Sequence, residues 1–151
     1  MIMKKLSLYL LVVLFGVYIF GCKKDETTSA KENLIGKWMV TAMTISPAYY
    51  GITDMFSTND ACSKDDLTIF NADGTVQTDE GLIKCNASDP QTTNDGTWTL
   101  SADGKTLTMT ESASSISVIT IVTLSSSSFV GKMTRVESGV TYTYTITLVK
   151  K

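Results

Sequence analysis

Apolar and polar residues alternate with period two over most of the chain after Gly36, which is the spacing of strands and not of helices. The segment from Val140 to Leu148 shows this most clearly: valine, tyrosine, isoleucine and leucine take one face, and four threonines take the other. A strand with this pattern faces a core on one side and solvent on the other. The alternation therefore favours an all-β, antiparallel domain.

The tripeptide Ala-Asp-Gly occurs twice between threonine-rich runs, at residues 72–74 and 102–104. Each tripeptide predicts a hairpin turn, because glycine adopts the positive φ that a tight turn needs. Asn71 and Asp73 also carry the oxygen ligands that calcium prefers. No bidentate glutamate follows at the spacing of a calcium loop, so we favour the turn.

Eight strands follow one another as neighbours, with no helix long enough to cross over a sheet between them. They are predicted at about residues 37–45, 67–70, 75–78, 97–100, 106–109, 116–124, 128–135 and 140–148. The connection at 46–65 holds the only short helix that we expect within the domain. Closing such a meander into a barrel removes exposed strand edges. The sequence therefore predicts an eight-stranded antiparallel up-and-down β-barrel.

The amino terminus carries an export pattern. Lys4 and Lys5 precede an apolar run at 6–20, which is shorter than the roughly 20 residues of a membrane-spanning helix. The run ends in Ile19-Phe20-Gly21-Cys22, which resembles the lipobox of bacterial lipoproteins. This resemblance implies cleavage before Cys22 and its lipidation, which ties the chain to a membrane outside the cytoplasm. An uncleaved anchor with an incidental cysteine is the alternative.

The residues after Cys22 point to a location. Lys23-Lys24-Asp25-Glu26 resembles a signal that sends some Bacteroidota lipoproteins to the outer face of the outer membrane. That resemblance implies display at the cell surface, and the periplasmic leaflet is the alternative. We expect a signal peptide at 1–21, a lipidated polar tether at 22–33 with Thr27 to Lys31 as linker, and the barrel domain at 34–151.

Cys62 and Cys85 remain once Cys22 is lipidated. Outside the cytoplasm a pair of cysteines forms a disulfide more often than a metal or redox site. The two connections that hold Cys62 and Cys85 lie at one end of the predicted meander, so the two residues can meet. The tight Ala-Asp-Gly turns lie at the other end. We therefore expect a disulfide, an open mouth and a closed base.

The start of the first strand carries a family resemblance. Gly36-Lys37-Trp38 resembles the Gly-x-Trp signature of lipocalins, and residues 34–151 look like the lipocalin-like (calycin-like) domains of Bacteroidota lipoproteins. The resemblance implies that Gly36 and Trp38 mark the base of the barrel and that a small apolar molecule binds inside it. An arginine covers the signature tryptophan in lipocalins. Here we expect Lys150 or Lys151 to serve at the base, because Arg135 should lie at the mouth.

Several residues near the predicted mouth are candidates for contact with a ligand. The aromatic residues of the first connection, together with Met55, either form a lid or pack down over the barrel end. Arg135 pairs either with a carboxylate or phosphate head group or with Glu137 or Asp79 at the surface. The tyrosine hydroxyls of the last strand bond either a ligand or a protein group. The candidates are Tyr49, Tyr50, Phe56, Arg135, Tyr142 and Tyr144.

The composition argues against other classes of function. The chain has 13 Lys and Arg, 15 Asp and Glu, and a net charge of -2, so it has no general attraction for nucleic acid. It has no histidine, the usual general base and metal ligand. The acidic pairs Asp65-Asp66 and Asp79-Glu80 show no sign of the pocket and raised pKa that a catalytic dyad needs. We expect no enzyme, no metal and no cofactor.

Two classes of function remain open. One is a membrane-anchored lipoprotein that binds a small apolar or amphipathic molecule in its barrel. The other is a non-enzymatic structural or interaction lipoprotein with a filled barrel, such as an accessory subunit or a surface antigen. The stretch from Val118 to Val122 is apolar on both faces. We expect the segment around Leu34, or a protein partner, to cover part of its outer face.

Overall fold

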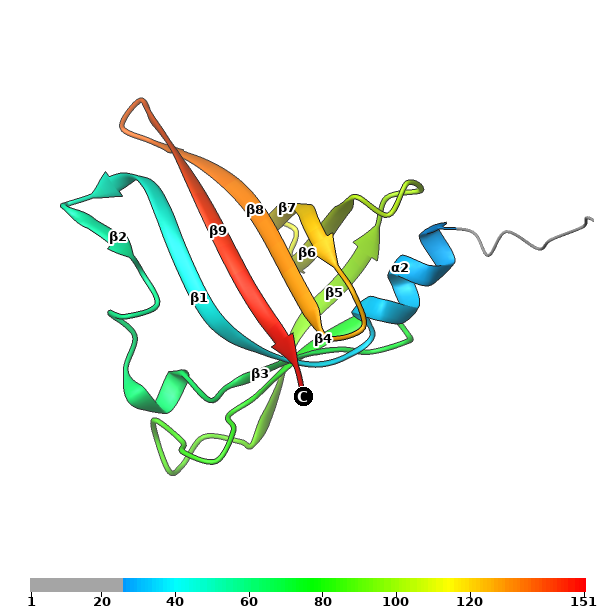
Figure 1. Cartoon of the computed structure of the whole chain (residues 1–151). Helices are drawn as coiled ribbons and strands as arrows, with labels where there is room; N and C mark the ends of the chain where they lie inside the picture. The colour runs from blue at the N-terminus through cyan, green and yellow to red at the C-terminus, as the bar shows by residue number, and fades with distance from the viewer. Residues whose placement is uncertain (1–25) are drawn as a thin grey trace, which may run out of the picture.

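The computed structural model describes residues 26–151, which form one closed antiparallel β-barrel (Figure 1). The predictions for the signal peptide and Cys22 lie outside these residues. Each barrel strand pairs with the next, and β1 pairs with β9 to close the barrel. The predicted eight-stranded meander is thereby confirmed. Its strands are β1 (Gly36–Tyr49), β3 (Leu67–Phe70), β4 (Thr75–Asp79), β5 (Thr92–Leu100), β6 (Thr106–Ser112), β7 (Ser115–Leu124), β8 (Ser128–Glu137) and β9 (Val140–Lys150).

The first strand is longer than predicted. β1 continues past Ile45, because β9 pairs with it as far as Ser46 and the short strand β2 (Ile52–Asp54) pairs with its far end. The connection to β3 contains the one-turn 3-10 helix η2 (Ala61–Ser63), so the expected short helix is present there. Among the described residues, no helix has the length and apolarity needed to cross a membrane.

The two Ala-Asp-Gly turns form as predicted. Gly74 has a φ of 89° and Gly104 a φ of 68°, both in the left-handed region that glycine tolerates. The Asp73 carboxylate accepts hydrogen bonds from the backbone N–H and the hydroxyl of Thr75. These two bonds hold the pKa of Asp73 below its usual value, the backbone bond having the larger effect.

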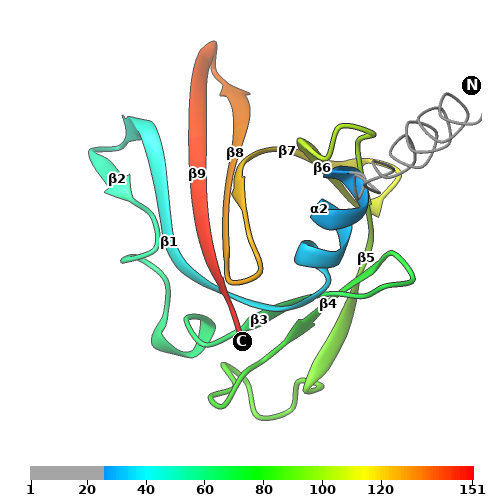
Figure 2. The same cartoon turned by 45° about the vertical axis from the view of Figure 1, so that its right-hand side comes forward.

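The segment expected to be a polar linker is a helix. Helix α2 (Glu26–Leu34) includes residues 27–31 and lies against the barrel (Figure 2). Four of its nine residues, Thr27, Thr28, Ser29 and Asn33, are weak helix formers, so the helix depends on packing at its end. Leu34 is fully buried in the barrel core, and its carbonyl accepts a 2.7 Å hydrogen bond from the Trp38 indole N–H. The end of α2 is therefore part of the domain.

Leu34 does not cover the outer face of β7. It lies in the inner core with Trp38, whereas Val118 and Val122 on the outer face are each more than half exposed. The expectation that the segment around Leu34 shields this face is wrong. The physical reason is that the buried indole of Trp38 needs a hydrogen-bond acceptor, and the end of α2 supplies it at the base.

Lys150 takes the place at the base that the sequence predicts for Lys150 or Lys151. Its Nζ lies 5.2 Å from the centroid of the Trp38 ring and donates a 2.8 Å hydrogen bond to the carbonyl of Asn33. A Cβ on Gly36 would lie 2.7 Å from Cε of Lys150. Glycine at the start of β1 therefore leaves room for the lysine that covers the signature tryptophan.

Cys62 and Cys85 form the predicted disulfide. The carboxylate of Asp65 also accepts hydrogen bonds from the backbone N–H groups of Leu82, at 2.6 Å, and Ile83, at 3.1 Å. The connection between β4 and β5 is thereby held against the connection that precedes β3. The side chain of Leu82 nevertheless points to solvent and is 97% exposed.

The buried end of α2 predicts a contrast between two leucines. Leu34→Ala is expected to lower the free energy of unfolding by about 2–5 kcal/mol, because it leaves a cavity in the core. Leu82→Ala removes the same atoms from an exposed site and is expected to change it by less than about 0.5 kcal/mol. Urea unfolding followed by tryptophan fluorescence measures both. Equal effects would show that α2 is not packed into the domain.

Candidate ligand-binding site

The lower half of the barrel is filled with side chains. The rings of Trp38 and Phe129 meet edge to face at 6.3 Å, and those of Phe70 and Trp98 at 5.9 Å. These aromatic pairs pack with aliphatic residues into one buried cluster. It comprises Leu34, Trp38, Phe70, Val76, Trp98, Leu107, Ile119, Phe129 and Leu148. This cluster closes the base, as the sequence predicts.

An apolar cavity of about 160 Å³ lies above this cluster, between β1 and strands β6 to β9. Five of its lining residues are methionine or isoleucine, and the other two contribute hydroxyl groups. The lining is Met43, Met109, Ser117, Ile119, Met133, Tyr144 and Ile146. An engineered apolar cavity of about 150 Å³ holds a benzene molecule. The cavity therefore suits one small ring or part of an alkyl chain.

The sizes of the side chains explain why the barrel is hollow here. Along the inner face of β8, the large Phe129 is followed by Gly131 and then by Met133. A Cβ on Gly131 would lie 2.5 Å from Cγ2 of Ile119, so glycine is needed for this close packing. Above it the wall consists largely of flexible methionines, which adapt to the shape of what they contact.

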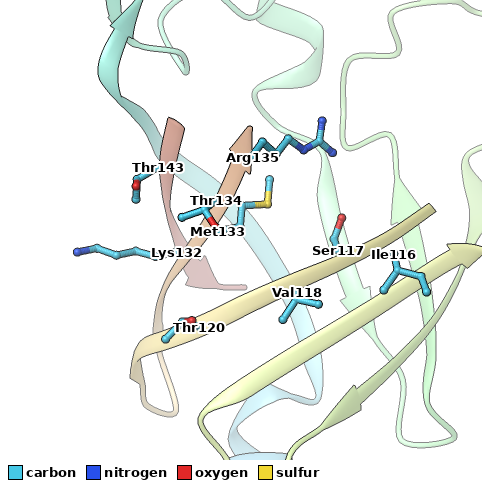
Figure 3. Close-up of a pocket in the computed structure, with 9 residues that line it drawn as sticks. All are labelled: Ile116, Ser117, Val118, Thr120, Lys132, Met133, Thr134, Arg135 and Thr143. Atoms are coloured by element: carbon cyan, nitrogen blue, oxygen red, sulfur yellow. The ribbon is translucent and has the colours of Figure 1, made fainter. Parts of the chain in front are cut away.

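A pocket lies between β7 and β8 in the barrel wall, and we call it the slot. It is lined by the residues shown in Figure 3: Ile116, Ser117, Val118, Thr120, Lys132, Met133, Thr134, Arg135 and Thr143. The ladder between these strands runs from Leu124 and Phe129 only as far as Thr120 and Lys132. A register shift between Ile121 and Thr123 interrupts it, and a β-bulge of this kind bends the strand that carries it. Beyond Thr120 the two strands separate.

The slot has a volume of about 500 Å³, and Ser117 and Met133 line both it and the apolar cavity. The two spaces therefore adjoin through these side chains. In Figure 3, Arg135 extends from β8 towards the side on which Ser117 lies, whereas Lys132 points the opposite way. Arg135 is consequently the cation of the slot that is directed towards β7.

Arg135 forms no ion pair within residues 26–151. The sequence offered Glu137 and Asp79 as surface partners, and neither pairs with it. Asp79 pairs instead with Lys37, at 3.1 Å. For Asp79 the reason is topological, because β8 and β4 are separated around the barrel by three strands on either side. The Arg135 guanidinium is left exposed and available.

Acidic residues line a second hollow, of about 540 Å³, against β4 to β6. The Asp95 carboxylate accepts a 2.5 Å hydrogen bond from the hydroxyl of Thr78, and Glu111 accepts one of 2.9 Å from Ser115. Sequence reasoning missed both acids. The alternation of β6 could have predicted that Glu111 faces inward, because Glu111 follows the inward-facing Leu107 and Met109 at a spacing of two residues.

Three of the candidate aromatic residues, Tyr49, Tyr50 and Tyr142, gather at the rim of the barrel, apart from the cavity. The Tyr49 ring packs against Tyr142 at 5.4 Å and Tyr50 at 4.7 Å, and Tyr50 is 89% exposed. The negative charge of Glu137 raises the pKa of Tyr49, and Tyr50 has the next largest effect in the same direction. Phe56 is half-buried, with Lys64 over its ring. Of the six candidates, Tyr144 lines the cavity and Arg135 lines the slot.

Asp66 has a raised pKa, which the sequence did not indicate for the pair Asp65-Asp66. Burial raises the pKa of Asp66, and repulsion from Glu80, Asp65 and Asp79 adds to the effect. One of its carboxylate oxygens is buried without a hydrogen-bond partner. Asp66 lines neither the cavity nor the slot. Its raised pKa therefore reflects first its burial and then the acids that surround it near the disulfide-bonded connections.

The chain matches one family model and is similar to two solved structures of one bovine protein. The family model described as a lipocalin-like domain matches residues 34–131. No curated protein matches the chain. Among solved structures, bovine odorant binding protein with a selenium-containing odorant is 20% identical, with a TM-score of 0.41 over 80% of this chain and 72% of that one. The same bovine protein with its natural ligand is 22% identical, with a TM-score of 0.40 over 79% and 72%.

Proposed function

Because the chain belongs to the family of lipocalin-like domains, we propose that it binds a small apolar or amphipathic molecule inside its barrel. The apolar cavity of about 160 Å³ is the observation that carries this proposal. Removing apolar ligand surface from water there is worth about 25 cal/mol per Å². The fold alone would not support binding, since one fold serves many functions.

The polar groups of the cavity support a ligand with one polar end. Ser117 and Tyr144 line the cavity, and among residues 26–151 neither side chain hydrogen-bonds to another protein group. A hydroxyl group in apolar surroundings is stabilised by a hydrogen-bond partner, and a ligand can provide that partner. The lining holds no carboxylate, amine or thiol. It therefore supports the binding of a neutral or amphipathic molecule.

An interaction role is the second candidate, and the outer face of β7 favours it. Ile116, Val118 and Val122 are each more than half exposed on this strand. Exposed apolar side chains that cluster on one face mark contact sites for other proteins. In this alternative the barrel is an accessory subunit or a surface antigen, and its cavity has no occupant.

The proposal includes a lipid anchor at Cys22. The charged start, the apolar run at 6–20 and the lipobox-like end at Cys22 support it. Two or three acyl chains, at about 0.8 kcal/mol per buried methylene, make a firm anchor. The Lys-Lys-Asp-Glu segment at 23–26 supports display on the outer face of the outer membrane. An anchored barrel would collect its ligand close to the membrane surface.

Filling the cavity tests the binding function. Ser117→Leu places an apolar side chain in the cavity and is expected to weaken the binding of octan-1-ol at least tenfold, as measured by isothermal titration calorimetry. Thr141→Leu adds a leucine on the exposed face of β9 and should bind octan-1-ol as the unaltered protein does. If the unaltered protein gives no binding heat and no thermal shift with octan-1-ol, the barrel is not a binder of this class.

The anchor is tested at its cysteine. The full-length chain, produced in a bacterium that processes lipoproteins, is expected to fractionate with the envelope membranes. In Cys22→Ser the leader should remain uncleaved. The mass spectrum of its amino-terminal peptide should then show no acyl chain. Cys62→Ser serves as the control, since Cys62 lies in the barrel domain. An unacylated Cys22 in the membrane fraction would contradict the proposal.

A further inference from the structure

We infer that the ligand is a single-chain amphiphile with an anionic head group, and that this head group binds Arg135 in the slot between β7 and β8 while the chain occupies the apolar cavity. This inference rests on the proposed binding function and adds to it the chemistry of the ligand and its orientation.

The geometry joins an apolar space to a charged one. The cavity of about 160 Å³ is lined largely by methionine and isoleucine, and the slot of about 500 Å³ adjoins it through Ser117 and Met133. A molecule with its chain in the cavity thus has a polar end directed towards the slot. Such a molecule need not pass over the rim of the barrel.

Arg135 gives the slot its chemistry. It is the only arginine of the chain, and Figure 3 shows it extending from β8 towards the side on which Ser117 lies. It has no carboxylate partner within residues 26–151. A guanidinium binds carboxylate or phosphate through two parallel hydrogen bonds. A ligand anion would supply the partner that the protein itself does not.

The remaining charges of the upper barrel direct an anion to the same place. Asp95 and Glu111 lie in the hollow against β4 to β6, and Glu137 lies close enough to Tyr49 at the rim to raise its pKa. A negative head group is repelled from both places. The residues that line the slot include the cations Lys132 and Arg135 and no acid, so the slot is the hollow of the upper barrel whose own lining attracts an anion.

Carboxylate and phosphate share this chemistry, so the experiment includes both. Octanoate, octyl phosphate, octan-1-ol and octylammonium carry the same alkyl chain with different head groups. Isothermal titration calorimetry at low ionic strength is expected to give about tenfold tighter binding of at least one of the two anions than of octan-1-ol. Added salt should reduce that preference, because the contact is partly exposed.

Variants of Arg135 test its role. Arg135→Gln is expected to abolish the preference for the anion over octan-1-ol, and Arg135→Glu to favour octylammonium over octanoate. Such a reversal cannot arise from a failure to fold. Lys105→Gln makes the same change of charge in the turn between β5 and β6 at the base, and should leave the preference intact.

The outcomes separate this inference from the proposed function. If octan-1-ol binds as tightly as both anions, the anionic head group is wrong. If Arg135→Gln keeps the preference, the placement of the head group on Arg135 is wrong. In either case the apolar binding function stands. If none of the four compounds binds, both are wrong. A preference for octanoate over octyl phosphate, or the reverse, identifies the head group within the anionic class.

Discussion

The hydrogen bond from the Trp38 indole N–H to the Leu34 carbonyl is the contact on which the base of the barrel depends. Trp38 is fully buried, so its N–H needs a partner inside the protein. The partner is the end of α2, which brings Leu34 into the core. The Nζ of Lys150 lies over the ring, and Phe129 packs against it edge to face. One side chain therefore joins α2, β1, β8 and β9.

A solid base allows the upper barrel to remain open. The free energy gained by packing the aromatic cluster stabilises the closed end, so the strands above it need no continuous core. There the side chains become smaller or more flexible, from Phe129 through Gly131 to Met133 on β8. The bulge in β7 near Ile121 then bends this strand away from β8. Cavity and slot both follow from features just above the packed base.

The sequence predicted those parts of the structure that depend on local chemistry. Gly74 and Gly104 marked turns because few other residues adopt positive φ. The alternation in β9 predicted its inward face, and the order of the strands placed Cys62 near Cys85. Lys150 or Lys151 was expected at the base because the chain's arginine lies elsewhere, and Lys150 is the one that lies there.

The parts that depend on three-dimensional context were not predicted. The segment at 27–31 has no strong helical pattern and is helical because Leu34 anchors its end. The slot arises from a shift in strand register, which no residue type signals. Ser117 has an ordinary sequence context, and its place between the cavity and the slot emerges only when β7 and β8 separate.

The most direct test of a hollow, ligand-binding upper barrel is nuclear magnetic resonance of the protein labelled with ¹³C at the methionine methyl groups, in the presence of octan-1-ol. The account predicts intermolecular nuclear Overhauser effects from the alkyl chain to Met43, Met109 and Met133, which line the cavity. It predicts none to Met39 or Met55, which do not line it. Contacts confined to Met39 and Met55, or no contact at saturating octan-1-ol, would contradict it.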